Sequence, residues 1–236
     1  MRLKQVALDK LINYKSESSF GSKLRARRIA PLLSLIENIS LRDGKVSIID
    51  IGGTTEYWRI LPLGFVEKFN IHITIVNLPG TVLPENHDHF SYCSADGCEL
   101  SDIPDHSYHI SHSNSVIEHV GNWERMKSFA WHMRRIAQYY YVQTPNFWFP
   151  IEPHCLTPFF HWFPLPVQTW LVQRFSLGSW KKVPSIDSAV KHVESYRLIT
   201  KSMFRVLFPD AIIRTETVLG LPKSIIGIRS SNPISC

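Results

Sequence analysis

The stretch Asp50-Ile51-Gly52-Gly53-Thr54 decides the fold of this chain. It closes the apolar run 46–49, which is typical of a strand buried on both faces of a parallel sheet. Glycines at the carboxyl end of such a strand let the backbone approach a ligand closely, and ligands of open α/β sheets bind beyond these ends. The stretch therefore predicts the first strand of an α/β sheet, with a nucleotide-like ligand at its tip.

Outward from that strand, apolar runs alternate with helical or loop segments. This alternation predicts a mostly parallel sheet with helices on both faces. The last two strand-like runs are so close in sequence that they can form only an antiparallel hairpin. We expect strands over 46–51, 71–78, 90–95, 107–113, 139–144, 211–218 and 224–229, and helices over 2–14, 23–39, 61–70 and 118–136.

Length and charge bound the organisation of the chain. With 236 residues, of which 44% are hydrophobic, it is long enough to bury the core of one domain. We predict a single domain over 1–236, with a helical arm at 1–42 and an aromatic cap at 146–205. Residues 1–28 hold eight basic and two acidic residues, an excess equal to the net charge of +6. Such an arm can meet anionic lipid, nucleic acid or a phosphorylated substrate, or form a solvated helical face.

The cysteines and histidines give no metal-binding pattern at the level of sequence. Four cysteines at irregular spacing predict neither a disulfide framework nor a zinc site, and no secretory signal opens the chain, so we expect a cytoplasmic protein. Two of the histidines lie three apart on an expected strand and therefore point to opposite faces. We predict no metal site among His87, His89, His106, His109 and His112.

Four stretches, each at the end of an expected strand, resemble the class I S-adenosylmethionine-dependent methyltransferases. They are 49–54, 75–78, 95–97 and 113–120. The last resembles the strand-four exit of the type 11 subgroup, and the run 142–154 is similar to bacterial members that accompany cell-surface polysaccharide synthesis. The resemblance covers residues 46–229. It implies a Rossmann-like doubly wound sheet and S-adenosylmethionine as the cofactor.

The resemblance assigns the methionine end of the cofactor to the first strand tip. Asp50 would orient the loop and help to bind the amino group of the cofactor. The backbone at Gly52 and Gly53 would pass close to the methionine part, where a side chain would clash. Thr54 would complete this set, although the family usually has a further glycine at its position.

The remaining implied contacts lie at the next strand tips. The residue that ends strand two usually accepts both ribose hydroxyls and is usually acidic, whereas this chain has Asn77, followed by Leu78. An amide can accept one hydrogen bond and donate another, but loses the charge-assisted part. Asp96 would accept the adenine amino group, Gly97 would give backbone room, and Ser113 would contact the cofactor near the sulfonium.

Methyl transfer to a hydroxyl also requires that the hydroxyl lose its proton, a task suited to histidine or a carboxylate. The catalytic candidates are His119, which follows strand four, and Glu152 and His154, which follow strand five. Glu118 and His161 are weaker candidates. The alternatives are helix capping or packing for His119, packing for His154 and loop anchoring for Glu152.

Residues 153–173 carry no formal charge and are rich in aromatic side chains. Three prolines would break a continuous helix, so we do not expect a membrane span. The segment can be an aromatic lid over a sugar or apolar acceptor, a face that dips into the membrane interface, or a buried cap. A peripheral position at the inner membrane surface follows from the second alternative.

We predict O-methylation of a glycan, a glycolipid or a small amphipathic acceptor, which can be lipid-linked. One alternative is a nucleic-acid methyltransferase, but the stretch 113–116 lacks the Asn/Asp-Pro-Pro-aromatic signature of base-directed members. A second is a non-catalytic binding protein that keeps the methyltransferase fold. The oligomeric state stays open.

Overall fold

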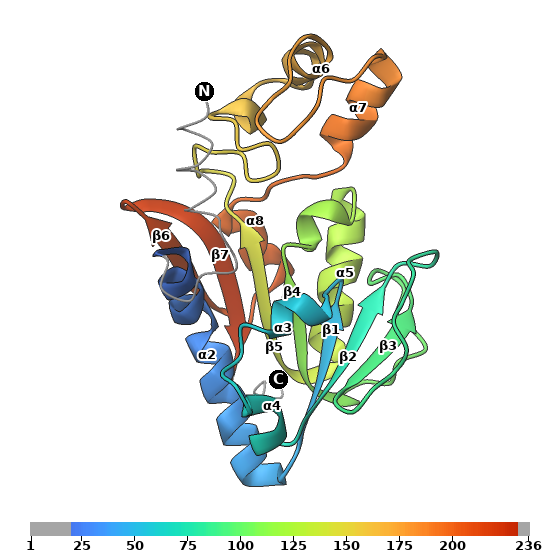
Figure 1. Cartoon of the computed structure of the whole chain (residues 1–236), viewed down its shortest axis with the longest axis vertical. Coiled ribbons are helices and arrows are strands. Elements are labelled where there is room, and N and C mark those ends of the chain that lie inside the picture. The colour runs from blue at the N-terminus through green and yellow to red at the C-terminus, as the bar shows by residue number, and fades with distance from the viewer. Residues whose placement is uncertain (1–19, 231–236) are drawn as a thin grey trace. The chain divides into compact units, whose positions relative to one another are not determined.

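The computed structural model describes residues 20–230 (Figure 1). These fall into two compact units, one formed by residues 20–46 and 54–72 and the other by residues 47–53 and 73–230. The helix expected over 2–14 lies outside the described residues. The expected single domain over 1–236 remains a prediction.

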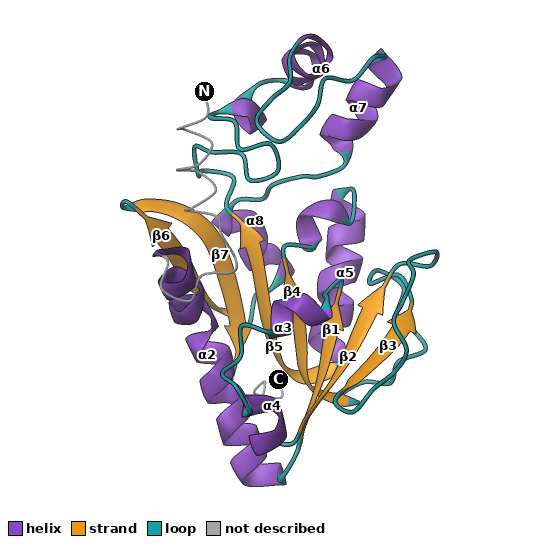
Figure 2. Ribbon diagram, in the orientation of Figure 1, coloured by secondary structure: helices purple, strands orange, loops and turns teal. Residues whose placement is uncertain are grey.

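The second unit is built around a seven-stranded sheet with the order β3-β2-β1-β4-β5-β7-β6 (Figure 2). The pairs β2/β3, β1/β4 and β4/β5 are parallel, whereas β7 runs antiparallel to both β5 and β6. The predicted mostly parallel sheet with a C-terminal antiparallel hairpin is therefore confirmed. The strands are β1 (Val46–Ile51), β2 (Ile71–Asn77), β3 (Phe90–Ser94), β4 (Tyr108–Asn114), β5 (Ala137–Pro145), β6 (Ile212–Val218) and β7 (Leu221–Arg229).

Two helices pack with this sheet, α5 (Trp123–Arg135) and α8 (Lys201–Leu207). Apolar side chains of both join those of β1 and β5 in one continuous core. Phe129 and Phe204 are fully buried in it. The core fixes the carboxyl ends of β1, β4 and β5 relative to one another, and the candidate site is built at these ends.

The helix expected over 118–136 is wrong at its start. The chain first makes a 3-10 turn, η1 (Ile117–His119), and α5 begins only at Trp123. Gly121 has φ of 112°, which a helix cannot continue through, and the Asn122 side chain then caps α5 by accepting the N–H of Arg125 at 3.0 Å. This break holds Glu118 and His119 outside the helix.

The first unit contains α2 (Phe20–Asp43), α3 (Thr55–Trp58) and α4 (Phe65–Lys68). The helix expected over 23–39 is longer than predicted, because Pro31 is accommodated inside it and the chain turns only at Gly44, at φ 72°. The helix expected over 61–70 is reduced to one turn, since Gly64 also has φ of 72°. The short helix α3 was not predicted.

The cap at 146–205 contains η2 (Phe160–Trp162), α6 (Leu165–Arg174) and α7 (Ile186–Glu194), drawn beyond the carboxyl end of β5 in Figure 1. It has a small core of its own around Cys155 and Phe160. Not every aromatic is buried there: several are between 40% and 58% exposed, namely Trp148, Phe159, Trp162, Phe163 and Trp170. Within residues 20–230, no helix has the length and apolar character needed to cross a membrane.

Candidate functional site

The loop after β1 is shaped by two glycines that no other residue can replace without movement. Gly52 has φ of 75°, and a Cβ there would lie 2.7 Å from a methyl group of Val116. A Cβ on Gly53 would lie 1.7 Å from the Asp50 carboxylate. The backbone therefore follows a path that only glycine permits, at the strand tip where the sequence predicts the methionine part of the cofactor.

Asp50 is fully buried beneath this loop. Its Oδ1 lies 2.6 Å from Nδ1 of His112 on β4, and the His112 ring stacks on Tyr141 of β5 at 5.6 Å between centroids. The position fits the expectation that Asp50 orients the loop. Direct contact with the amino group of a cofactor stays a prediction.

A side chain at the tip of β2 secures the loop from the neighbouring strand. Asn77 donates a hydrogen bond from Nδ2 to the Gly53 carbonyl at 3.1 Å. A carboxylate could not make this bond, so the amide has a structural reason at a position where the family usually has an acid. Leu78 follows at 57% exposure, and Thr54 caps α3 by accepting the N–H of Tyr57.

Asp96 follows β3 and is held by two donors. Its Oδ1 accepts the N–H of Cys98 at 2.8 Å and its Oδ2 pairs with Arg125 at 2.6 Å. Partial burial would raise the pKa of Asp96, but these hydrogen bonds and the charge of Arg125 outweigh it, so the pKa lies below its ordinary value. The carboxylate is thus ionised and oriented where the sequence predicts an adenine contact.

Two further cofactor candidates are explained by packing in the structure. A Cβ on Gly97 would lie 2.6 Å from Ile51 and 3.0 Å from Phe129, so this glycine gives room to core side chains. Ser113 is fully buried and donates to the Ile51 carbonyl at 3.2 Å, which ties β4 to β1. Their contacts with a cofactor stay predictions.

The three catalytic candidates lie together in one hydrogen-bonded chain. Glu152 is fully buried, and its Oε1 lies 2.6 Å from Nδ1 of His154. Nε2 of His154 lies 3.0 Å from Nε2 of His119, whose Nδ1 lies 3.0 Å from the Ser195 carbonyl. Partial removal of water from around its ring lowers the pKa of His119. The sequence named these residues but not their connection, which joins η1 to the cap.

Glu118, a weaker candidate in the prediction, is a fourth titratable side chain beside these three. It is fully buried, and one carboxylate oxygen accepts the hydroxyl hydrogen of Thr144 at 2.9 Å. The other, Oε1, has no hydrogen-bond partner among the described residues. Burial raises the pKa of Glu118 to about 7. One ligand atom each of Glu118, His119 and His154 lie within 4.8 Å of one another.

A cavity of about 510 Å³ adjoins this cluster on the cap side. Tyr196 lines it and also packs on the His154 ring, with 4.5 Å between centroids. His161 lines it too and donates from Nε2 to the Phe147 carbonyl at 2.8 Å, which leaves Nδ1 as an acceptor. In the described part of the chain, His161 Nδ1 and the Tyr196 hydroxyl have no partner. Both atoms are buried, so the polar groups that the cavity offers beside its aromatic surface come from exposed lining residues such as Asn122 and Glu194.

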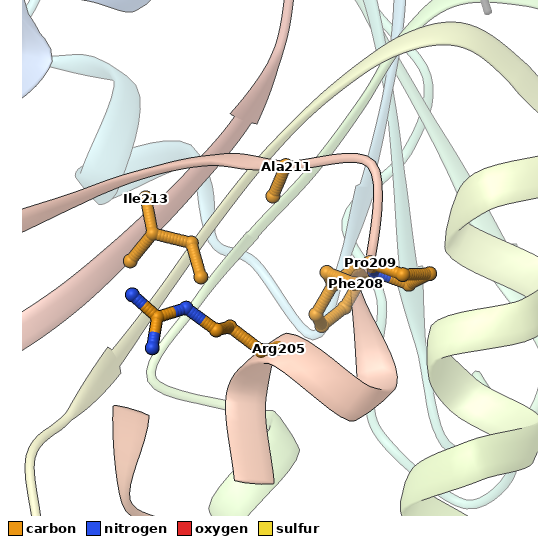
Figure 3. Close-up of a pocket in the computed structure, with 5 residues that line it drawn as sticks. All are labelled: Arg205, Phe208, Pro209, Ala211 and Ile213. Carbon is orange, nitrogen blue, oxygen red and sulfur yellow. The ribbon is translucent and has the colours of Figure 1, made fainter. Parts of the chain in front are cut away.

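A second cavity, of about 290 Å³, lies between α8 and β6 (Figure 3). Its lining contains no candidate residue, and Arg205 is its one charged member. The histidines that we excluded as ligands line neither of these cavities: His109 bonds to Ser47, His87 stacks on Phe90, and His112 is buried against Asp50.

The strand order β3-β2-β1-β4-β5-β7-β6 and the antiparallel C-terminal hairpin identify a Rossmann-like fold of the kind found in methyltransferases. The chain matches no protein family and no curated protein. Among solved structures it is similar to the CMeT domain of the citrinin polyketide synthase, at 11% identity and a TM-score of 0.54 over 89% of this chain. It spans 54% of that chain, so the likeness shows the fold alone.

Two other solved structures are also similar, with lower TM-scores. The PH0226 protein from Pyrococcus horikoshii OT3 is 12% identical, with a TM-score of 0.47 over 91% of this chain and 93% of its own. An O-methyltransferase family protein from Burkholderia thailandensis is 11% identical, with a TM-score of 0.45 over 89% of this chain and 58% of its own.

Proposed function

We propose that this protein is an S-adenosylmethionine-dependent methyltransferase that methylates a hydroxyl of a glycan, a glycolipid or a small amphipathic molecule. The observation that carries the proposal is the glycine loop after β1, held from below by Asp50 and from the side by Asn77. In a sheet of this order, ligands bind beyond the carboxyl ends of the strands, where this loop lies.

The polar groups around the loop support an adenosine-containing ligand. The Asn77 carboxamide has two N–H groups and one oxygen, so its bond to Gly53 leaves capacity for a ribose hydroxyl. Asp96 presents an ionised carboxylate one strand further along, suited to the adenine amino group. Methyl transfer from a sulfonium needs little more from the protein than alignment and exclusion of water.

The acceptor half of the proposal rests on the cluster and the cavity on the cap side. We propose that His119 and His154, oriented by Glu152, activate the acceptor hydroxyl. The adjoining cavity of about 510 Å³ is lined by Phe147 and Tyr196 together with Asn122 and Glu194, a mixture of aromatic surface and hydrogen-bonding side chains suited to a sugar. The exposed aromatic side chains of the cap support an acceptor that also carries an apolar part.

The first test is calorimetric titration of the protein with S-adenosylmethionine and S-adenosylhomocysteine. We expect one-to-one binding that Asp96→Ala weakens at least tenfold. Asp105→Ala is the matched control, because Asp105 pairs with an arginine at the other end of α5 and should leave the affinity unchanged. Absence of binding at millimolar ligand would contradict the proposal and favour a binding protein that keeps the fold.

The second test concerns the acceptor. Purified protein with labelled methyl donor is offered free oligosaccharides, lipid-linked oligosaccharides and RNA. Methyl transfer to a sugar hydroxyl, lost in His161→Ala, is the expected result. Transfer to RNA alone would contradict the acceptor class while leaving the methyl donor intact.

A further inference from the structure

The hydrogen bonds around the two histidines fix where their hydrogens lie. The Ser195 carbonyl can only accept, so Nδ1 of His119 carries the hydrogen of that bond. The Glu152 carboxylate also accepts the backbone N–H groups of His154 and Cys155, and it is an acceptor for Nδ1 of His154 as well. In the neutral rings, both Nε2 atoms then present a lone pair.

These two Nε2 atoms face each other at 3.0 Å. Two opposed lone pairs repel, so the contact requires a positive charge between them, either a proton or a metal ion. A proton would serve the two nitrogens alone and leave Glu118 Oε1 buried without a partner among the described residues. A metal ion would serve both rings and the Glu118 carboxylate, because one ligand atom from each of the three residues lies within 4.8 Å of the other two.

We propose that Glu118, His119 and His154 bind a divalent transition-metal ion. Two imidazole nitrogens at about 2.1 Å from one ion lie about 3.0 Å apart at the right angle of an octahedral site and about 3.4 Å apart at the tetrahedral angle, so the 3.0 Å in this structure matches the octahedral arrangement. Binding of the ion does not depend on the proposed methyl transfer.

The surroundings of the three ligands match those of protein metal sites. Metal-bound histidines donate their other ring N–H to a carboxylate or a carbonyl, and metal-bound carboxylates are themselves hydrogen-bonded. His154 donates to Glu152, His119 donates to the Ser195 carbonyl, and Thr144 donates to the second oxygen of Glu118. Each ligand thus has its orienting partner in place.

The donor set narrows the choice of ion. Two imidazoles and one carboxylate suit zinc, iron, cobalt or nickel better than calcium or magnesium, which prefer oxygen ligands. Three protein ligands leave further positions open, and His119 is exposed. The site is therefore of the open kind, in which water or an acceptor hydroxyl can complete the coordination.

The test is titration of the EDTA-treated full chain with Co²⁺ and with Zn²⁺, followed by calorimetry and by the visible absorption of Co²⁺. We expect one ion per chain. Glu118→Gln, His119→Gln and His154→Gln should each weaken binding at least 100-fold. Glu152→Gln keeps all three ligands and should weaken binding 10- to 100-fold with a shifted Co²⁺ spectrum, because it only positions His154.

The control is the double variant His87→Asn/His89→Asn, which removes a surface pair and should bind as the wild type does. Unfolding in EDTA shows which variants are folded. If a variant at a buried position does not fold, His119→Gln gives the decisive comparison with the wild type, because His119 is exposed. The proposal is overturned if the wild type binds no ion, if folded His119→Gln binds equally well, or if only the surface pair matters. No methyl donor is present, so these outcomes leave the proposed methyl transfer untouched. A bound ion would change only how the acceptor hydroxyl is activated, because it would occupy the Nε2 lone pairs of both histidines.

Discussion

The strand-tip loop and the histidine cluster are built in opposite ways. The loop, residues 50–53 with Asn77, is held by neighbouring strands and by steric exclusion, because its glycines admit no side chain. The cluster, Glu118, His119, Glu152 and His154, is assembled from two segments by hydrogen bonds between titratable groups. The first region has a backbone path fixed by its surroundings, whereas the second contains a buried oxygen that lacks a partner in the described residues.

Under the proposed function, this difference matches the different tasks of the two regions. A cofactor that is the same in every turnover is best served by a rigid backbone path, which costs nothing to organise when the ligand arrives. A reacting hydroxyl needs groups whose charge can respond. Substitutions in the loop should therefore act mainly through shape, and substitutions in the cluster through charge.

The largest effect is expected from Gly53→Ala. The new methyl group would lie 1.7 Å from the Asp50 carboxylate, so the loop must shift, and we expect a loss of about 3 kcal/mol in the free energy of unfolding in urea. S-adenosylmethionine binding should also be lost. Gly80→Ala is the matched control: Gly80 has φ of 89° but open space around it, so its cost should be about 1 kcal/mol. Equal costs would show that sterics do not shape the loop.

The next effect tests the support beneath the loop. Asp50→Asn weakens the fully buried bond to His112 and should cost about 2 kcal/mol of unfolding free energy. His112→Gln should cost a similar amount. Because both remove one interaction, the double variant should be clearly less destabilised than the sum. Strict additivity in urea unfolding would mean that the two side chains do not support each other.

A smaller effect, of opposite sign, is expected in the cluster. Glu118→Gln replaces a half-partnered buried carboxylate by a neutral side chain of the same shape, and in EDTA it should stabilise the protein by about 1 kcal/mol. Glu152→Gln is the matched control. Glu152 is equally buried but accepts three N–H groups, so its amide should destabilise by about 2 kcal/mol. If both variants lose stability equally in urea, the unpartnered oxygen of Glu118 does not destabilise the folded protein.

The two regions also differ in how far the sequence predicted them. Six of the seven strands fall within two residues of the predicted bounds, because apolar runs and the glycines after β1 act locally, and β7 begins at Leu221, three residues before its predicted start. The packing of Gly97 against Phe129 was not predicted, since Phe129 comes from a helix distant in the sequence, and its predicted role beside a cofactor stays untested. Tertiary contacts of this kind leave no periodic signal.

The cluster was predicted only as separate residues. Glu118 received little weight, because its partner Thr144 and the histidine His154 lie 26 and 36 residues away in the sequence. The break at Gly121, which keeps Glu118 and His119 out of α5, had a local signal in the Gly-Asn pair followed by Glu124. Reading that helix start would have placed both side chains at the strand tip.

The smallest effect concerns the charge at the edge of the loop region. The folded pKa of Asp96 lies below its ordinary value of 3.8, so the folded state binds this proton more weakly than the unfolded state. The resulting stability is complete above the unfolded pKa and is lost as the pH falls through the folded one. We expect Asp96→Asn to be less stable than the wild type at pH 7, by under about 1 kcal/mol because Arg125 is 41% exposed and screened by solvent.

Urea unfolding of both proteins between pH 7 and pH 3 measures this difference. The gap should close below pH 4, where the wild type gains the proton that the amide mimics. Glu99→Gln is the control, since Glu99 faces the same Arg125 at 3.7 Å but is 74% exposed, and it should show no gap at any pH. A stability difference for Asp96→Asn that persists unchanged at pH 3 would mean that shape, and not charge, holds Asp96. The tip of β3 would then resemble the glycine loop after β1, where steric exclusion fixes the structure.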